Sequence, residues 1–174
     1  LDFSTTMSML STATTMAADE GATMLAQFAN ITQMDQTQYD ELASSIVALG
    51  NSYATTEQKI TEMSQGIAAS ASLAGMSEAD MLGLSAAVSS LGIESQMGST
   101  AVSKLISMLM TAVETGDGLE DLAYVAGMSA DQFAEAWGNN AVGALESFVV
   151  GLSDTERLGQ SAIVTLTDLG VTET

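Results

Sequence analysis

Neighbouring carboxylates are the side chains of this sequence whose type and spacing could do chemistry. Two carboxylates at one site can divide acid and base catalysis between them, as in glycoside hydrolysis. They occur at Asp19-Glu20, Asp40-Glu41 and Glu120-Asp121, and Glu78 is close to Asp80. Each group falls where the surrounding sequence predicts a helix to begin, and a carboxylate there stabilises the positive end of the helix dipole. We therefore assign these residues a structural role and predict no catalytic residue.

Other reactive groups are scarce. The chain has no histidine and no cysteine, which removes the commonest general base, the thiolate nucleophile and most zinc ligands. Residues 117–121, Asp-Gly-Leu-Glu-Asp, are similar to the start of a calcium loop but lack its alternating ligands and its terminal glutamate. The methionines fall at helical spacing, where filling a core is their usual role. We predict no metal site and no cofactor site.

The charge balance excludes one large class of partners. Three basic residues stand against 22 acidic ones, and the net charge is −19. Binding to nucleic acid depends on clustered Lys and Arg side chains that contact phosphates, so this chain is not expected to bind DNA or RNA. No uncharged apolar run is long enough to span a bilayer, and no membrane contact is predicted for this segment.

A recurring pattern marks three helix starts. Ser77 with Asp80 has the spacing of a capping box, in which a side chain before the helix and one in its first turn each bond the other's backbone amide. The methionine before the cap and an apolar residue in the second turn can pack together as a hydrophobic staple. The same pattern occurs at 34–39 and 128–133. It predicts helices that begin within about two residues of Gln36, Glu78 and Ala130.

Glycines and further caps predict the remaining helix boundaries. We expect helices to break at Asp19-Glu20-Gly21, and to start at Thr55 with Gln58 and at Ser153 with Glu156. Glycine corners are expected at Gly50, Gly75, Gly92, Gly116, Gly127 and Gly151.

Apolar periodicity predicts which helix faces are buried. The central stretch, 73–116, is expected to form an antiparallel hairpin of two helices. Its first helix is predicted to bury Met81, Leu84, Val88 and Leu91, and Phe133 with Trp137 is predicted to face the core further along the chain. The stripe expected on the second helix of the hairpin consists of Val102, Leu105, Ile106, Leu109, Met110 and Val113.

These signals predict an all-α fold of about eight short to medium helices packed as antiparallel hairpins, with no sheet. Proline is absent from all 174 residues, and the alternation of a half-buried strand is missing. We divide the chain into N-terminal helices (1–72), the central hairpin (73–116) and C-terminal helices (117–174). Because it opens at Leu1 without an initiator methionine, we expect it to be one segment of a longer protein.

Several of these stretches resemble a known family. The order AGMSEAD, LGIESQMGSTAVSKL, AVETGDGLEDLAYVAGMSADQFAEAW and GALESFVVGL is similar to the core region of phage tail tape measure proteins. Upstream, LAQFANITQMDQTQYDELASSIVALGNSYATTE resembles the start of that region, so the likeness covers nearly the whole chain. It is a pattern of helix ends and small residues and contains no catalytic signature.

The resemblance implies a structural protein of a phage or prophage, present in several copies in the lumen of the tail tube. Such a protein sets tail length during assembly in the host cytoplasm and leaves ahead of the DNA. Tail tube proteins, tail assembly chaperones and tail-tip proteins are the partners it implies. Two alternatives remain open from the sequence: an acidic helical module that binds one partner protein, and a cell-wall hydrolase.

Overall fold

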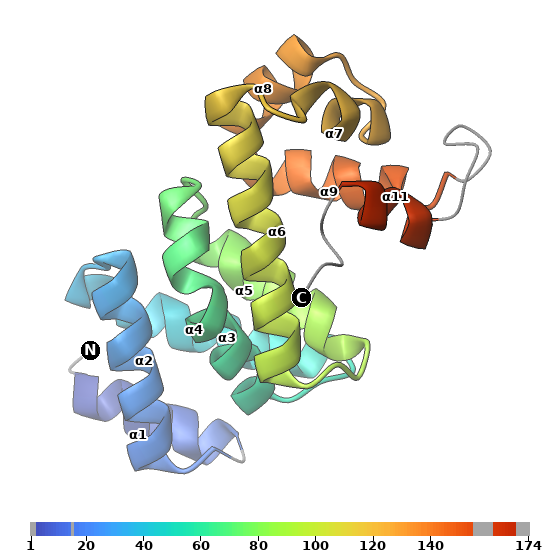
Figure 1. The fold of residues 1–174 in the computed structure, drawn as a ribbon. Coiled ribbons are helices and arrows are strands. Elements are labelled where there is room, and N and C mark those ends of the chain that lie inside the picture. The colour runs from blue at the N-terminus through green and yellow to red at the C-terminus, as the bar shows by residue number, and fades with distance from the viewer. Residues whose placement is uncertain (1–2, 15, 155–161, 170–174) are drawn as a thin grey trace. The chain divides into compact units, whose positions relative to one another are not determined.

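A computed structural model describes residues 3–14, 16–154 and 162–169, and these residues form helices joined by short turns (Figure 1). The described residues contain no strand, so the all-α prediction is confirmed. The chain divides into two compact units, one made of 1–73 with 77–103 and the other of 74–76 with 104–174.

The first unit is built around α4. Its helices are α1 (Phe3–Ala13), α2 (Ala18–Thr32), the 3-10 turn η1 (Gln36–Gln38), α3 (Tyr39–Ser52), α4 (Glu57–Leu73) and α5 (Glu78–Ser90). Helix α4 packs against α2, α3 and α5, while α1 packs against α2 and α3. Four α4 side chains, Ile60, Met63, Ile67 and Ala71, are fully buried as their spacing predicts.

The second unit begins within α6 (Ser95–Thr115), whose residues up to Ser103 belong to the first. It continues with α7 (Leu119–Val125), α8 (Ala130–Asn139), α9 (Ala141–Gly151) and α11 (Ala162–Asp168). Helices α7, α8 and α9 pack against one another. Phe133 and Trp137 are buried with their ring centroids 6.4 Å apart, which confirms the predicted aromatic pair.

All three predicted capping boxes are present. Ser77 caps α5, since its Oγ accepts a hydrogen bond from the Asp80 amide (3.2 Å) and Asp80 Oδ2 accepts one from the Ser77 amide (3.0 Å). Ser129 and Gln132 form the same reciprocal pair before α8. Asp35 and Gln38 form it before η1. The helical turn that begins at Gln36 is a 3-10 turn, and it continues directly into α3.

Some predicted boundaries are wrong. Asp19-Glu20-Gly21 does not break a helix, because all three residues lie inside α2, where the two acidic side chains occupy the favourable first turn. Gly50 lies inside α3. The boundary predicted at Gly151 is correct, since α9 ends there, but Gly151 lacks the left-handed conformation found at Gly75, Gly92, Gly116 and Gly127. The cap of α4 is Thr56, whose Oγ1 accepts from the Lys59 amide, one residue later than predicted.

The buried faces of α5 and α6 differ in how well periodicity predicted them. Leu84 and Val88 of α5 are half-buried, and Leu91, the residue after its end, is 75% exposed. The apolar side chains of α5 point to all sides of the helix, so they form no single stripe. Its buried face is Met81, Leu82, Ser85, Ala86 and Ser89. In α6, Ile106 and Leu109 are fully buried as predicted, and the other four predicted residues are half-buried.

The observed contacts of α5 are with α4 and α3, which precede it in the chain. Its pairing with α6 as a hairpin, and the three-part division of the chain, stay predictions. The predicted cap at Ser153 with Glu156 lies partly outside the described residues.

Glycine allows α4 and α6 to cross closely within the first unit. A Cβ atom added at Gly66 would lie 2.5 Å from the Cβ and Oγ of Ser99, and Ser103 Oγ donates to the Gly66 carbonyl at 3.3 Å. A Cβ at Gly98 would lie 2.5 Å from Met63 Cε. At Gly66 the cost of glycine within a helix is therefore offset by a close approach to the short Ser99 side chain, whereas at Gly98 the flexible end of Met63 can move aside.

Gly66→Ala is expected to destabilise the protein although alanine favours helix. Alanine gains about 1 kcal/mol of helix propensity, whereas forcing Cβ against the short Ser99 side chain costs about 1–3 kcal/mol. Gly83→Ala is the matched control, because Gly83 is also within a helix but a Cβ there meets nothing within 4 Å. Chemical denaturation should show a lower free energy of unfolding for Gly66→Ala and a higher one for Gly83→Ala. A higher value for both variants would contradict the close crossing.

Ser77→Ala should lower the free energy of unfolding by about 1 kcal/mol, because it leaves the Asp80 amide at the start of α5 without its acceptor. Ser107→Ala, on the exposed side of α6, is the control and should change stability by less than about 0.5 kcal/mol. Equal effects of the two substitutions in thermal or urea unfolding would show that the cap contributes nothing.

Candidate functional site

The structure places every candidate carboxylate pair at the start of a helix. Asp19 and Glu20 lie in the first turn of α2, and the other pairs lie in the first turns of α3, α5 and α7. Asp80 is further engaged, since it accepts from both the amide and the hydroxyl of Ser77. All of these carboxylates therefore lie near the positive end of a helix dipole, as the sequence predicted.

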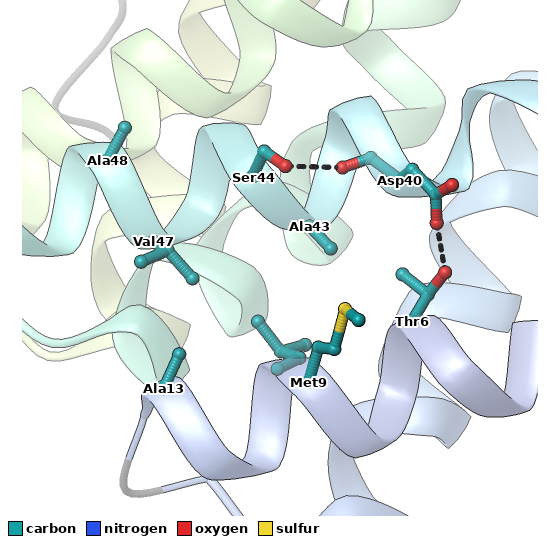
Figure 2. Close-up of a pocket in the computed structure, with 9 residues that line it drawn as sticks. Thr6, Met9, Ala13, Asp40, Ala43, Ser44, Val47 and Ala48 are labelled. Atoms are coloured by element: carbon teal, nitrogen blue, oxygen red, sulfur yellow. Dashed lines mark hydrogen bonds between the residues drawn. The ribbon is translucent and has the colours of Figure 1, made fainter. Parts of the chain in front are cut away.

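The α1–α3 groove is an apolar hollow of about 370 Å³ between two helices of the first unit (Figure 2). Helix α1 contributes Met9, Leu10 and Ala13 to it, and α3 contributes Ala43, Val47 and Ala48. Leu10 is buried at its base, whereas the Met9 side chain is 57% exposed. The groove is thus mainly apolar, and its three polar lining residues are Thr6, Asp40 and Ser44.

One carboxylate stands at the end of this groove. Thr6 donates its hydroxyl to Asp40 Oδ1, and Ser44 Oγ donates to the Asp40 carbonyl at 2.7 Å, as Figure 2 shows. The hydrogen bond from Thr6 lowers the pKa of the Asp40 carboxyl from its ordinary value. Asp40 therefore joins α3 to α1 in its ionised form, and this contact between distant segments was not predictable from the sequence.

A second hollow brings together two of the carboxylates that the sequence singled out. It has a volume of about 300 Å³ and lies between the starts of α3 and α5, with Glu41 and Glu78 among its lining residues. Leu42 and Leu82 are buried at its base. The rest of the lining includes the polar residues Gln38, Ser45 and Ser77.

Metal binding and membrane crossing find no support in the described part of the chain. No group of three or more acidic residues lies close enough to hold a metal ion there. The segment 117–121, considered above as a calcium loop, forms a turn in which Gly118 has a φ of 70° and α7 begins at Leu119. No described helix is both long enough and apolar enough to span a membrane.

The sequence profile of the phage-related minor tail proteins matches residues 1–167. The chain belongs to this family. No curated protein and no solved structure gives a significant match. This minor tail protein thus has a structural role in the phage tail and is a component of the virion.

The hollows of the tail protein show what sequence analysis missed. Glu41 and Glu78 were recognised separately, but their common hollow depends on how α3 packs against α5. The α1–α3 groove was missed altogether, because alanine, methionine and valine on a helix give no signal that distinguishes a groove from a core. Only the pairing of helices reveals either surface.

Acid should weaken the cap at Asp35 of the tail protein. The backbone amide of Thr37 donates to Asp35 Oδ1 and is the largest cause that lowers the pKa of this carboxyl. A lowered folded pKa gives stability that is complete above the unfolded value of about 3.9, and that is lost as pH falls through the folded value.

Asp35→Asn keeps an amide oxygen at this position but removes the titration. The loss of unfolding free energy between pH 5 and pH 3 should therefore be smaller in Asp35→Asn than in the unchanged protein. Glu146→Gln, an exposed change of equal charge in α9, should keep the full loss. An unchanged acid loss in Asp35→Asn, measured by urea unfolding at each pH, would show that the cap does not depend on the carboxylate.

Proposed function

We propose that this minor tail protein is a segment of a tape measure protein, which lies in the lumen of the tail tube, sets tail length during assembly and leaves ahead of the DNA. The observation that supports it most is the family match over 1–167, taken together with the resemblance of the helix ends to the tape measure core. The helical build of all described residues fits this role, since a helical chain can span a tube without exposing sheet edges.

The charge of the chain supports a place on the path of DNA. With 22 acidic and three basic residues, the surface repels phosphates and offers no basic patch to hold them. A protein that shares a narrow tube with DNA gains from this repulsion, because it does not bind the molecule that must follow it.

The proposed partners are tail tube proteins, tail assembly chaperones, tail-tip proteins and further copies of the chain. The α1–α3 groove supports docking of another protein, since Met9 is exposed beside apolar walls. The hydrolase alternative has little support, because the described candidate carboxylates sit at helix starts and the sequence has no histidine or cysteine.

We further propose that this segment is folded before assembly and not drawn out as one helix. Four left-handed glycines, Gly75, Gly92, Gly116 and Gly127, each follow the end of a helix. The longest helix, α6, has 21 residues and spans roughly 30 Å at 1.5 Å per residue. An unbroken helix of 174 residues would span roughly 260 Å.

An in-frame deletion of residues 1–174 in the parent phage tests this proposal. Tail lengths measured by electron microscopy should decrease, but by much less than the roughly 260 Å of a continuous helix, because the folded segment is shorter than its chain. A tandem duplication of the segment is the matched variant and should lengthen the tail by the same amount.

Two results would overturn parts of this proposal. A decrease close to the full helical value would show that the chain is drawn out in the tail and would refute the folded segment. Unchanged tail length in viable particles of both variants would instead refute a role as a ruler and favour an adaptor that binds one partner.

A further inference from the structure

The second unit has a surface hollow where α6 ends and α7 begins, and the proposed function gives it no role. We call it the α6–α7 hollow. Its volume is about 430 Å³, its apolar lining includes Met108, Ala112, Leu122 and Leu169, and two aspartates, Asp117 and Asp121, also line it. Ala112 and Leu122 are buried, whereas both aspartates are exposed. The hollow thus joins an apolar floor to an acidic rim.

The two rim carboxylates have no partner among the residues that the structure describes. No described side chain or amide donates a hydrogen bond to either carboxylate, and neither forms an ion pair with a described residue. The backbone amide of Asp117 donates to Thr115 Oγ1 at 3.2 Å, which fixes the turn beside the rim. These aspartates differ from Asp35 and Asp80, whose carboxylates bond the amides of a capping box.

The end of α6 adds further negative charge at the same place. A helix C-terminus carries a partial negative charge that Lys or Arg in the last turn usually offsets. Helix α6 has no basic residue in its last turn, which instead contains Glu114, and Asp117 follows two residues after its end. Asp121 also lies in the first turn of α7, whose dipole presents its positive end, whereas no basic side chain of the described residues pairs with Glu114, Asp117 or Asp121.

We propose that the α6–α7 hollow receives a lysine or arginine side chain from a different, basic protein. The methylene stem of such a side chain suits the apolar floor, while its charged head reaches the two carboxylates and the negative end of α6. This proposal rests on the hollow alone and holds whether or not the segment acts as a ruler.

The composition of the chain argues against a second copy as the donor. The sequence has only three basic residues. Lys59 forms an ion pair with Glu94 at 3.8 Å in the first unit, and Lys104 is also engaged. Two copies, each with a net charge of −19, would moreover repel each other, which favours a basic protein of another kind as the donor.

Hexylammonium chloride is a suitable probe, because it combines an alkyl stem with a positive head. Titration into the isotopically labelled 174-residue chain at constant ionic strength, followed by amide NMR shifts, should give saturable changes around residues 108–122. 1-Hexanol has the same stem without the charge and should give weaker binding there.

Two double variants distinguish binding to the two rim aspartates from an effect of the net charge of the protein. Asp117→Asn with Asp121→Asn should weaken hexylammonium binding by about threefold to tenfold, as expected for two exposed charge contacts. Glu135→Gln with Glu146→Gln removes the same charge from exposed positions of α8 and α9 and should leave the affinity unchanged. Circular dichroism of both variants checks that the helices remain.

Three outcomes would overturn the proposal. Equal binding of hexylammonium and 1-hexanol would show that the hollow accepts apolar groups irrespective of charge. Equal weakening by the two double variants would show that the probe responds only to net charge. Shifts spread over acidic residues of both units, without saturation around 108–122, would show that the hollow is no site.

Discussion

Close approach of helix backbones is the interaction on which this protein most depends. The chain has only eight aromatic residues and many small ones, so its large buried side chains are mostly leucine, isoleucine and methionine and the small residues set how closely the helices approach. At the crossing of α4 and α6, Gly66 lies directly against Ser99, and the Ser103 hydroxyl bonds the glycine carbonyl. In α5, Ser85, Ala86 and Ser89 form much of the buried face. Small side chains at these crossings thus let the helix backbones lie close together, so each such contact is sensitive to the addition of a single methyl group.

The sequence predicted helix ends better than it predicted helix faces. Capping boxes depend on residues three positions apart, so Ser77, Asp35 and Ser129 could be recognised without any knowledge of the fold. The face of α5 could not, because its apolar residues surround the helix and the choice of face depends on α3 and α4. Gly21 shows the same limit, since it seemed a helix breaker but lies within α2, where a Cβ would approach Met16 Sδ to 2.8 Å.

For the candidate site, the sequence predicted where the carboxylates lie but not which surfaces could receive a partner. The expectation that these carboxylates lie at helix starts follows from position alone, and the structure places all four groups in first turns. The surfaces that can receive a partner, the α1–α3 groove and the α6–α7 hollow, arise from tertiary packing and have no sequence signature. In a structural tail protein this is expected, because contact surfaces need shape and charge, whereas a catalytic centre needs particular reactive groups.

Helix α6 belongs to both compact units, since the boundary between them falls after Ser103 in its middle. A change in α6 near this boundary is therefore expected to affect the packing of both units, because each unit takes part of this helix into its own fold.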